Sequence, residues 1–223
     1  MDWGEFINLM RPLLPLLMKG AGVTLLVFGA TLVFALPLGL VFTTASLSRF
    51  APLRWLSNAY IWLFRGTPLM LQLYFMYFGL PILTHQRIMF AALPTAVITF
   101  ILNYAAYFAE IYRGGIQSID KGQYEAAKTL GFTKWDTMRH IIIPQTIRRV
   151  IPALANESIT LSKDTALISA ISAADLLKYT KDQVNRTSKP IIYVIAAVFY
   201  LIFTFLLTLL ASWLERRFSQ HEK

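Results

Sequence analysis

The sequence predicts an all-α protein that crosses a membrane several times. Of its 223 residues, 56% are hydrophobic and 15% are charged, whereas soluble domains average about 25% charged residues. A soluble fold of this length could not bury so much apolar surface. Several stretches without Asp, Glu, Lys or Arg are also long enough to cross the ~30 Å hydrocarbon core of a bilayer as helices. These two observations predict a polytopic bundle.

Five membrane helices are expected in order along the chain. Four charge-free stretches are long enough to span, and a fifth segment is apolar except for Glu157, Lys163 and Asp164. The first stretch follows an acidic start and is too long for a cleaved signal peptide, so we expect it to be retained. The predicted spans are 18–47, 58–82, 90–112, 150–173 and 190–214.

The distribution of positive charge predicts the orientation. With the N-terminus outside, thirteen Lys and Arg residues fall on the inside and seven fall outside, as the positive-inside rule favours. This bias explains the net charge of +9 without a nucleic-acid partner, and the sequence contains no nucleic-acid-binding motif. We therefore expect an N-out/C-in arrangement, with these parts: an extracytoplasmic N-terminus 1–15, a membrane domain 16–216, its cytoplasmic loop 113–149, and a cytoplasmic tail 217–223.

The loop 113–149 carries the first motif. Seven positive and three negative charges make it too polar to span, and Gly131 predicts a bend between two short helices that Pro144 closes. It contains Glu125-Ala126-Ala127, with Gly131 four residues after the second alanine and Ile-Ile-Ile-Pro at 141–144. This spacing resembles the EAA loop of binding-protein-dependent ABC importers, with isoleucine at 143 instead of leucine. The alternative is an ordinary solvated hairpin.

Three further blocks extend the resemblance. Residues 107–116 resemble the Y-x-A-E-x-x-R-G-G-I pattern of the polar amino acid ABC transporter permease family, and 65–72 resemble its R-G-T-P-L-x-x-Q. Residues 156–167 resemble N-E-x-x-x-x-x-K-D-T-S-L, with Ala166 in place of the serine. The blocks follow in order over roughly 16–216. The resemblance implies the type I ABC importer permease fold, as a multi-pass protein of the cell membrane.

The resemblance also implies a function and partners. Members of this family are membrane permease subunits that form the translocation pathway for polar amino acids by alternating access. The implied partners are ATPase subunits that bind ATP and Mg²⁺, a second permease copy or homologue, and an extracytoplasmic solute-binding protein. The residues expected to couple this chain to the ATPase are Glu125, Ala126, Ala127, Gly131 and Pro144. Small alanines would let a short helix enter a groove of the partner, and glycine permits the turn.

Polar side chains recur at membrane depth on the third and fourth predicted spans. Residues 103, 107 and 110 lie on one helical face, and the pairs 156/163 and 157/164 form two adjacent stripes. Ionisable groups inside a membrane are costly, so they indicate a functional site. The ammonium and carboxylate of an amino acid would suit such charges. The candidate solute-binding residues are Asn103, Tyr107, Glu110, Glu157, Lys163, Asp164 and Thr165.

Structural roles remain open for most of these residues. Lys163 could neutralise Glu157 or Asp164, and Glu110 could pair with Arg113 at the end of a helix. Asn103 and Tyr107 could instead form hydrogen bonds between helices. The 65–68 block fits a kink and helix start better than a ligand, because Pro68 lacks a backbone donor.

Other function classes find little support in the sequence. No phosphate-binding loop occurs, so we expect no ATP site and no cofactor in this chain. The three histidines lie in separate segments and there is no cysteine, which disfavours a metal site. No nucleophile and base stand together, so an enzyme is not expected. The alternative to an ABC permease is an ATP-independent, ion-coupled carrier or channel that uses Glu110, Glu157 and Asp164.

Overall fold

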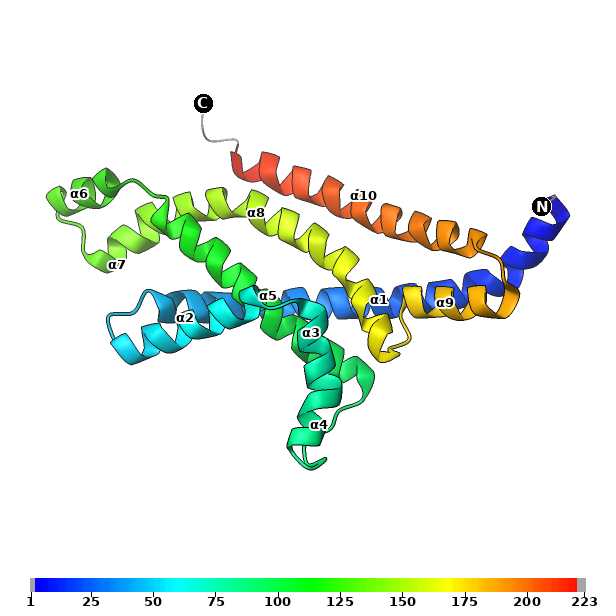
Figure 1. The fold of residues 1–223 in the computed structure, drawn as a ribbon. Helices are drawn as coiled ribbons and strands as arrows, with labels where there is room; N and C mark the ends of the chain where they lie inside the picture. The colour runs from blue at the N-terminus through cyan, green and yellow to red at the C-terminus, as the bar shows by residue number, and fades with distance from the viewer. Residues whose placement is uncertain (1–2, 220–223) are drawn as a thin grey trace. The chain divides into compact units, whose positions relative to one another are not determined.

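The computed structural model describes residues 3–219, and every regular element in that range is helical (Figure 1). The all-α prediction is therefore confirmed for this part of the chain. The first half contains α1 (Trp3–Ser46), α2 (Ala51–Gly66), α3 (Leu69–Tyr74), α4 (Leu80–Leu83) and α5 (Ala92–Gln117). The second half contains α6 (Lys121–Thr129), α7 (Lys134–Thr137), α8 (Ile143–Asp164), α9 (Leu176–Thr187) and α10 (Ile191–Ser219). Residues 1–2 and 220–223 of the predicted termini lie outside the described range.

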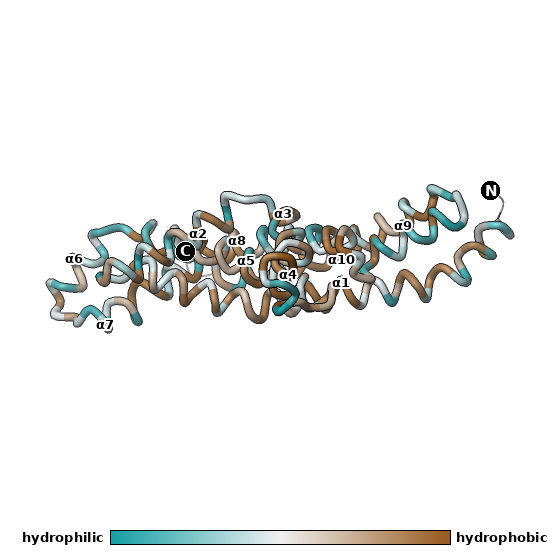
Figure 2. The backbone as a smooth tube through the Cα atoms, turned by 60° about the horizontal axis from the view of Figure 1, so that its bottom comes forward, coloured by the Kyte–Doolittle hydropathy of each residue, from teal (hydrophilic) through white to brown (hydrophobic). Residues whose placement is uncertain are grey.

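Three described helices are long and apolar enough to cross a membrane by themselves. They are Ile7–Ser46, Ala92–Gln117 and Ile191–Phe218, and Figure 2 shows the hydrophobic character of α1 and α10. A fourth span results if Ala51–Gly66 and Leu69–Leu83 are counted as one broken span. Helix α8 is not among the candidates. The count of five spans and the N-out/C-in orientation therefore stay predictions.

Several helix ends differ from the predicted spans. Helix α1 begins at Trp3, before the start of the predicted span near 18, and it continues through the exposed Arg11. The predicted segment 58–82 contains a break at Thr67-Pro68. Pro68 adopts an extended conformation before α3, and the side chain of Gln72 donates hydrogen bonds to the Thr67 carbonyl at 3.1 Å and hydroxyl at 2.7 Å. The kink and helix start expected at this block are confirmed.

The chain divides into two compact units. The first comprises 1–33, 67–101 and 159–206, and the second comprises 34–66, 102–158 and 207–223. Helices α1, α5, α8 and α10 contribute residues to both units.

The first unit is built around α1, α9 and α10. Leu13 and Leu17 of α1 form a buried core with Leu176 of α9 and Ile192 of α10. A Cβ atom at Gly20 would lie 2.8 Å from the carbonyl oxygen of Asp175. The absence of a side chain at Gly20 therefore lets the start of α9 lie directly against the backbone of α1.

The second unit packs α1 and α2 against α5. A Cβ atom at Gly39 would lie 2.9 Å from the Cβ of Phe108, so α1 and α5 approach closely. The Thr43 hydroxyl donates to the Ala109 carbonyl at 3.0 Å, and the Ser57 hydroxyl donates to the Phe42 carbonyl at 2.8 Å. These bonds satisfy polar groups between helices without bringing charge into the bundle.

Candidate coupling hairpin and solute site

Helices α6 and α7 form a hairpin whose turns follow from their sequence (Figure 1). The Asp120 side chain caps α6 by accepting the Gly122 N–H at 2.6 Å, and Thr133 caps α7 by accepting the Asp136 N–H at 3.1 Å. Gly131 between them has φ +80°, a left-handed conformation that favours glycine. The two short helices predicted around Gly131 are therefore confirmed.

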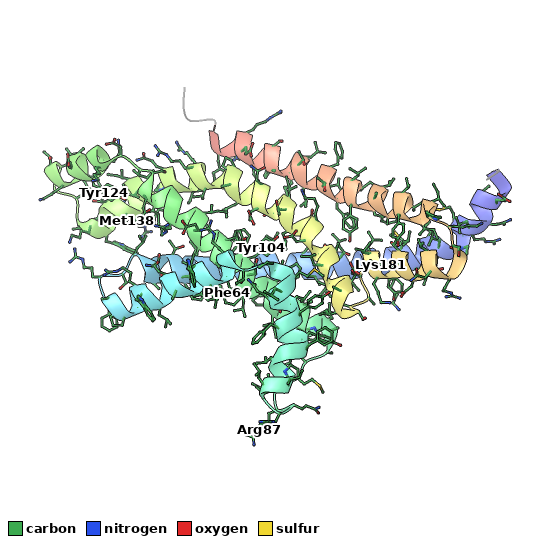
Figure 3. All side chains as sticks on the ribbon, viewed as in Figure 1. Phe64, Arg87, Tyr104, Tyr124, Met138 and Lys181 are labelled. Carbon is green, nitrogen blue, oxygen red and sulfur yellow. The ribbon has the colours of Figure 1, made fainter. Side chains whose placement is uncertain are left out.

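The Glu-Ala-Ala triplet lies on α6, and its members face different surroundings. Glu125 and Ala126 are exposed, but Ala127 is buried within the unit. Small size at 127 therefore serves the packing of the hairpin itself, because α6 lies against the π-helical turn Met138–Ile142. Figure 3 labels Tyr124 on α6 and Met138 on that turn. Burial raises the pKa of the Tyr124 hydroxyl.

Three large apolar side chains near Gly131 face solvent. Leu130 is 74% exposed, Trp135 is 68% exposed and Phe132 is 40% exposed. Single exposed apolar side chains are normal, but three of them within six residues of an otherwise polar hairpin are typical of a protein interaction site. These three residues were not predicted from the sequence as part of a site. Their signal was the presence of apolar side chains on both sides of Gly131 in a strongly charged segment.

Side chains of α8 connect it to the hairpin. Arg149 donates through Nη1 to the Ser118 carbonyl and, at 3.1 Å, to the Ser118 hydroxyl. Gln145 donates to the Gln123 side chain at 3.2 Å. These contacts join α8 to the end of α5 and to α6. They were not predicted, because 31 and 22 residues separate the partners in the chain.

The hairpin is shorter than the predicted loop 113–149. Helix α5 continues through Gln117, and α8 already begins at Ile143. Pro144 is thus the second residue of α8 rather than a residue between helices. Arg113 does not interrupt α5, since Arg is a good helix former and the helix end needs no apolar environment.

The predicted polar residues of α5 all have protein partners. Glu110 forms an ion pair with Arg113, including an Nε–Oε2 hydrogen bond of 3.0 Å, and Arg65 Nη1 lies 3.6 Å from Glu110 Oε1. The Arg65 guanidinium also lies over the Tyr107 ring, 5.5 Å from its centroid. Asn103 donates to the Phe64 carbonyl at 3.2 Å. Glu110 therefore has the ion pair with Arg113, and Asn103 the hydrogen bond between helices, that were left open as structural roles. Arg65 is a further partner of Glu110.

A pocket of about 290 Å³ lies beside this network, between α5 and α8 of the second unit. It exists because small residues face one another where the two helices approach. A Cβ atom at Gly114 would meet open space, whereas one at Gly115 would lie 2.2 Å from a methyl carbon of Val150. The lining residues are Glu110, Ile111, Gly114, Gly115, Ser118, Arg149, Val150 and Ala153.

The remaining candidate solute residues lie on α8 or directly after it. Glu157 is half-buried on α8, Lys163 is exposed, and Asp164 is the last residue of α8. Thr165 is buried at the start of the 3₁₀ helix Thr165–Ile171, and its hydroxyl donates to the Ser162 carbonyl at 2.8 Å. The lysine, aspartate and threonine thus lie where the α-helix changes to a 3₁₀ helix.

The candidate residues divide between the two units. Asn103, Tyr107, Glu110 and Glu157 belong to the second unit, and residues 163–165 belong to the first. Within residues 3–219, no group of three or more His, Asp or Glu side chains is arranged to hold a metal ion.

The chain is similar to permease proteins of known transport systems. It is 36% identical to the arginine transport system permease protein ArtQ of Bacillus subtilis (strain 168), with 95% of this chain and 96% of that protein covered. It is 37% identical to the glutamine transport system permease protein GlnP of Escherichia coli (strain K12), with 97% of both covered.

Two solved structures share its fold. A crystal structure of an amino acid ABC transporter with histidines matches with a TM-score of 0.88 and 34% identity, covering 97% of this chain and 99% of that chain. An inward facing structure of the MetNI methionine ABC transporter matches with a TM-score of 0.73, covering 94% and 99%, but at 20% identity shows the fold alone. The expected type I permease fold is therefore confirmed.

The sequence also matches a family described as "Binding-protein-dependent transport system inner membrane component", over residues 35–220. The matched range includes the hairpin and all the candidate solute residues. The chain belongs to this family of inner membrane transport components.

Proposed function

We infer that the chain is the membrane permease subunit of an ABC importer for amino acids. The observation that carries this conclusion is the family match over residues 35–220. The named relatives are permease proteins of arginine and glutamine transport systems. The chain is thus a transport component of the inner membrane rather than an enzyme, and ATP and Mg²⁺ would bind to a separate ATPase subunit.

The hairpin α6–α7 is the proposed docking site for that ATPase. Glu125 offers an exposed negative charge, and Leu130 and Trp135 offer exposed apolar surface beside it. The Arg149–Ser118 and Gln145–Gln123 contacts would carry a displacement of the hairpin to α5 and α8. Gly131 would fix the turn of the hairpin, and Pro144 would lie in the first turn of α8, where the hairpin ends.

The segment 163–165 is the proposed centre of the solute site. Lys163 can attract a carboxylate, while Asp164 and the negative end of the α8 dipole can attract an ammonium group. Such charges at the end of an interrupted helix resemble the solute sites of other transporters. We also propose Asn103, Tyr107, Glu110 and Glu157 of the second unit as solute contacts, and each of them would have to exchange a present protein partner to bind a solute.

Transport would proceed by alternating access. We propose that two permease chains, identical or homologous, enclose the pathway and that an extracytoplasmic solute-binding protein delivers the amino acid. Closure of the ATPase subunits on ATP would move the hairpins and open the pathway outward, and hydrolysis would reset it.

The test is uptake of labelled amino acids by the complex reconstituted in proteoliposomes with its ATPase and binding protein. We expect uptake of at least one polar amino acid that stops when the ATPase cannot hydrolyse ATP. Uptake that persists with the inactive ATPase would instead establish an ion-coupled carrier.

Charge reversal on the hairpin tests the docking site. Glu125→Lys should weaken co-purification with the ATPase and lower uptake about tenfold, because losing an interfacial charge-assisted hydrogen bond costs about 1.5–3 kcal/mol. Glu215→Lys, the same change on α10, is the control and should leave both unchanged. Normal assembly and uptake in Glu125→Lys would contradict the docking role.

A further inference from the structure

Asp175 is a fully buried carboxyl group at the start of α9. Its Oδ1 accepts the Lys178 N–H at 2.8 Å and so caps the helix. Its Oδ2 is buried and has no hydrogen-bond partner among the described residues. A buried carboxylate oxygen without a donor is costly, so this group needs an explanation.

Helices α1 and α10 form the walls around this carboxyl group. Gly20 of α1 lies against the Asp175 backbone, and the Thr24 hydroxyl accepts the Leu176 N–H at 3.4 Å. Tyr200 of α10 lies within electrostatic range of Asp175, and its buried hydroxyl neighbours the Thr24 side chain of α1. The unsatisfied carboxyl oxygen and the Tyr200 hydroxyl thus belong to one apolar junction of three helices.

The nearby cations do not neutralise Asp175 by direct contact. Lys181, labelled in Figure 3, attracts the carboxylate, but its Nζ donates to the Ser169 hydroxyl at 3.2 Å. Lys178 pairs instead with Asp182 at 2.6 Å. Burial therefore dominates and raises the pKa of Asp175 from 3.8 to about 6, although backbone N–H groups and Lys181 oppose the rise.

We propose that Asp175 is a proton-binding site that controls the docking of α9 on α1 and α10. With a proton, Oδ2 gains a hydrogen to donate, and the Tyr200 hydroxyl, which interacts electrostatically with Asp175, is the proposed acceptor. Without the proton, a carboxylate oxygen stays buried and unsatisfied, which favours release of α9. Since α9 packs against the 3₁₀ helix that begins at Thr165, its docking bears on the segment 163–165.

The direction of the pH dependence follows from linkage. The docked carboxyl holds its proton more tightly than the undocked one, so docking strengthens as pH falls toward 5 and weakens as pH rises. A group with a pKa of about 6 when docked and 3.8 when free makes undocking roughly tenfold more favourable at pH 7.5 than at pH 5. This inference rests on the first unit alone and stands independently of the transported solute.

Hydrogen exchange in the intact transporter tests the proposal. The probe is the set of backbone amides of residues 177–187, measured in lipid nanodiscs between pH 5 and pH 7.5 and corrected for intrinsic exchange rates. We expect protection to fall about tenfold over this range. In Asp175→Asn, which keeps a capping oxygen but cannot ionise, we expect no such fall. A flat profile in the unaltered chain, or an equal fall in Asp175→Asn, would overturn the proposal.

A pair of lysine variants gives a second test that leaves Asp175 in place. Lys181→Gln removes the charge that favours the ionised carboxyl, so the midpoint of the protection change should move to higher pH. Lys178→Gln removes only the pair with Asp182 and should leave the midpoint unchanged. An unchanged midpoint in Lys181→Gln, or equal shifts in both variants, would contradict the proton site.

Discussion

Two adjacent glycines of α5 differ in what a side chain would meet. At Gly115 a Cβ atom would lie 2.2 Å from Val150 of α8, and at Gly114 it would meet open space. Gly115→Ala should therefore lower the stability of the purified transporter by about 1–3 kcal/mol, because α5 and α8 must move apart. Gly114→Ala is the matched control, with a gain of up to about 1 kcal/mol from helix propensity. Equal melting temperatures for the two variants would disprove the close approach.

Asp164 is the residue at which the proposed solute site can be tested by a single charge. Asp164→Asn keeps the size of the side chain and removes its attraction for an ammonium group. We expect the KM for uptake to rise about tenfold or more, the effect of losing a charge-assisted hydrogen bond of about 1.5–3 kcal/mol. Asp182→Asn on α9 makes the same chemical change away from the site. If the two variants transport alike, the assignment of segment 163–165 is wrong.

At the scale of the element, the turn between α6 and α7 depends on one backbone conformation. Gly131 has φ +80° and open space around it, so a substitution there changes backbone strain alone. Gly131→Ala should destabilise the turn by about 1–2 kcal/mol, and Gly131→Asn by less, because asparagine visits the left-handed region more readily. The readout is the number of amino acids transported per ATP hydrolysed. We expect this ratio to fall in the order glycine, asparagine, alanine, and any other order would contradict a backbone origin.

The helix interruptions show what sequence could predict and what it could not. Two prolines lie just after π-helical turns. Pro81 is two residues beyond the turn that ends at Gly79, and Pro144 is two residues beyond the turn that ends at Ile142. A proline ring clashes with the preceding helical turn, and a wider π turn relieves that clash while the helix continues. The sequence identified Pro144 as a boundary for this reason. It could not show that the chain would absorb the proline and stay helical.

The candidate site was predictable where partners are close in sequence. The Glu110–Arg113 pair was foreseen as an alternative because residues three apart share a helical face. Arg65 and Arg149 were not foreseen as partners, because their contacts come from helices distant in the chain. Residue type and spacing thus predict which side chains are polar and on which face they lie, while tertiary packing decides what they bind.

At the scale of the whole molecule, the length of α1 bears on the membrane topology. Its 44 residues extend about 66 Å at 1.5 Å per residue, more than twice the ~30 Å hydrocarbon core. Part of α1 must therefore project from the bilayer. Leu13 and Leu17 near its start pack on Leu176 of the polar helix α9, and Figure 2 shows the hydrophilic character of α9. We therefore predict that the start of α1 and α9 lie on the same side of the membrane, which agrees with the predicted five-span arrangement.

Labelling of single cysteines tests this arrangement directly, because the chain contains no native cysteine to remove. Asn8→Cys on α1 and Asn185→Cys on α9 should react with a membrane-impermeant maleimide applied outside intact spheroplasts. Thr129→Cys on α6 should react only after the membrane is opened, since the hairpin must face the ATPase. Reaction at 8 and 185 on opposite sides would contradict the packing of α1 on α9. Reaction at 129 from outside would reverse the predicted orientation, because a hairpin that meets an ATP-hydrolysing partner must lie where ATP is.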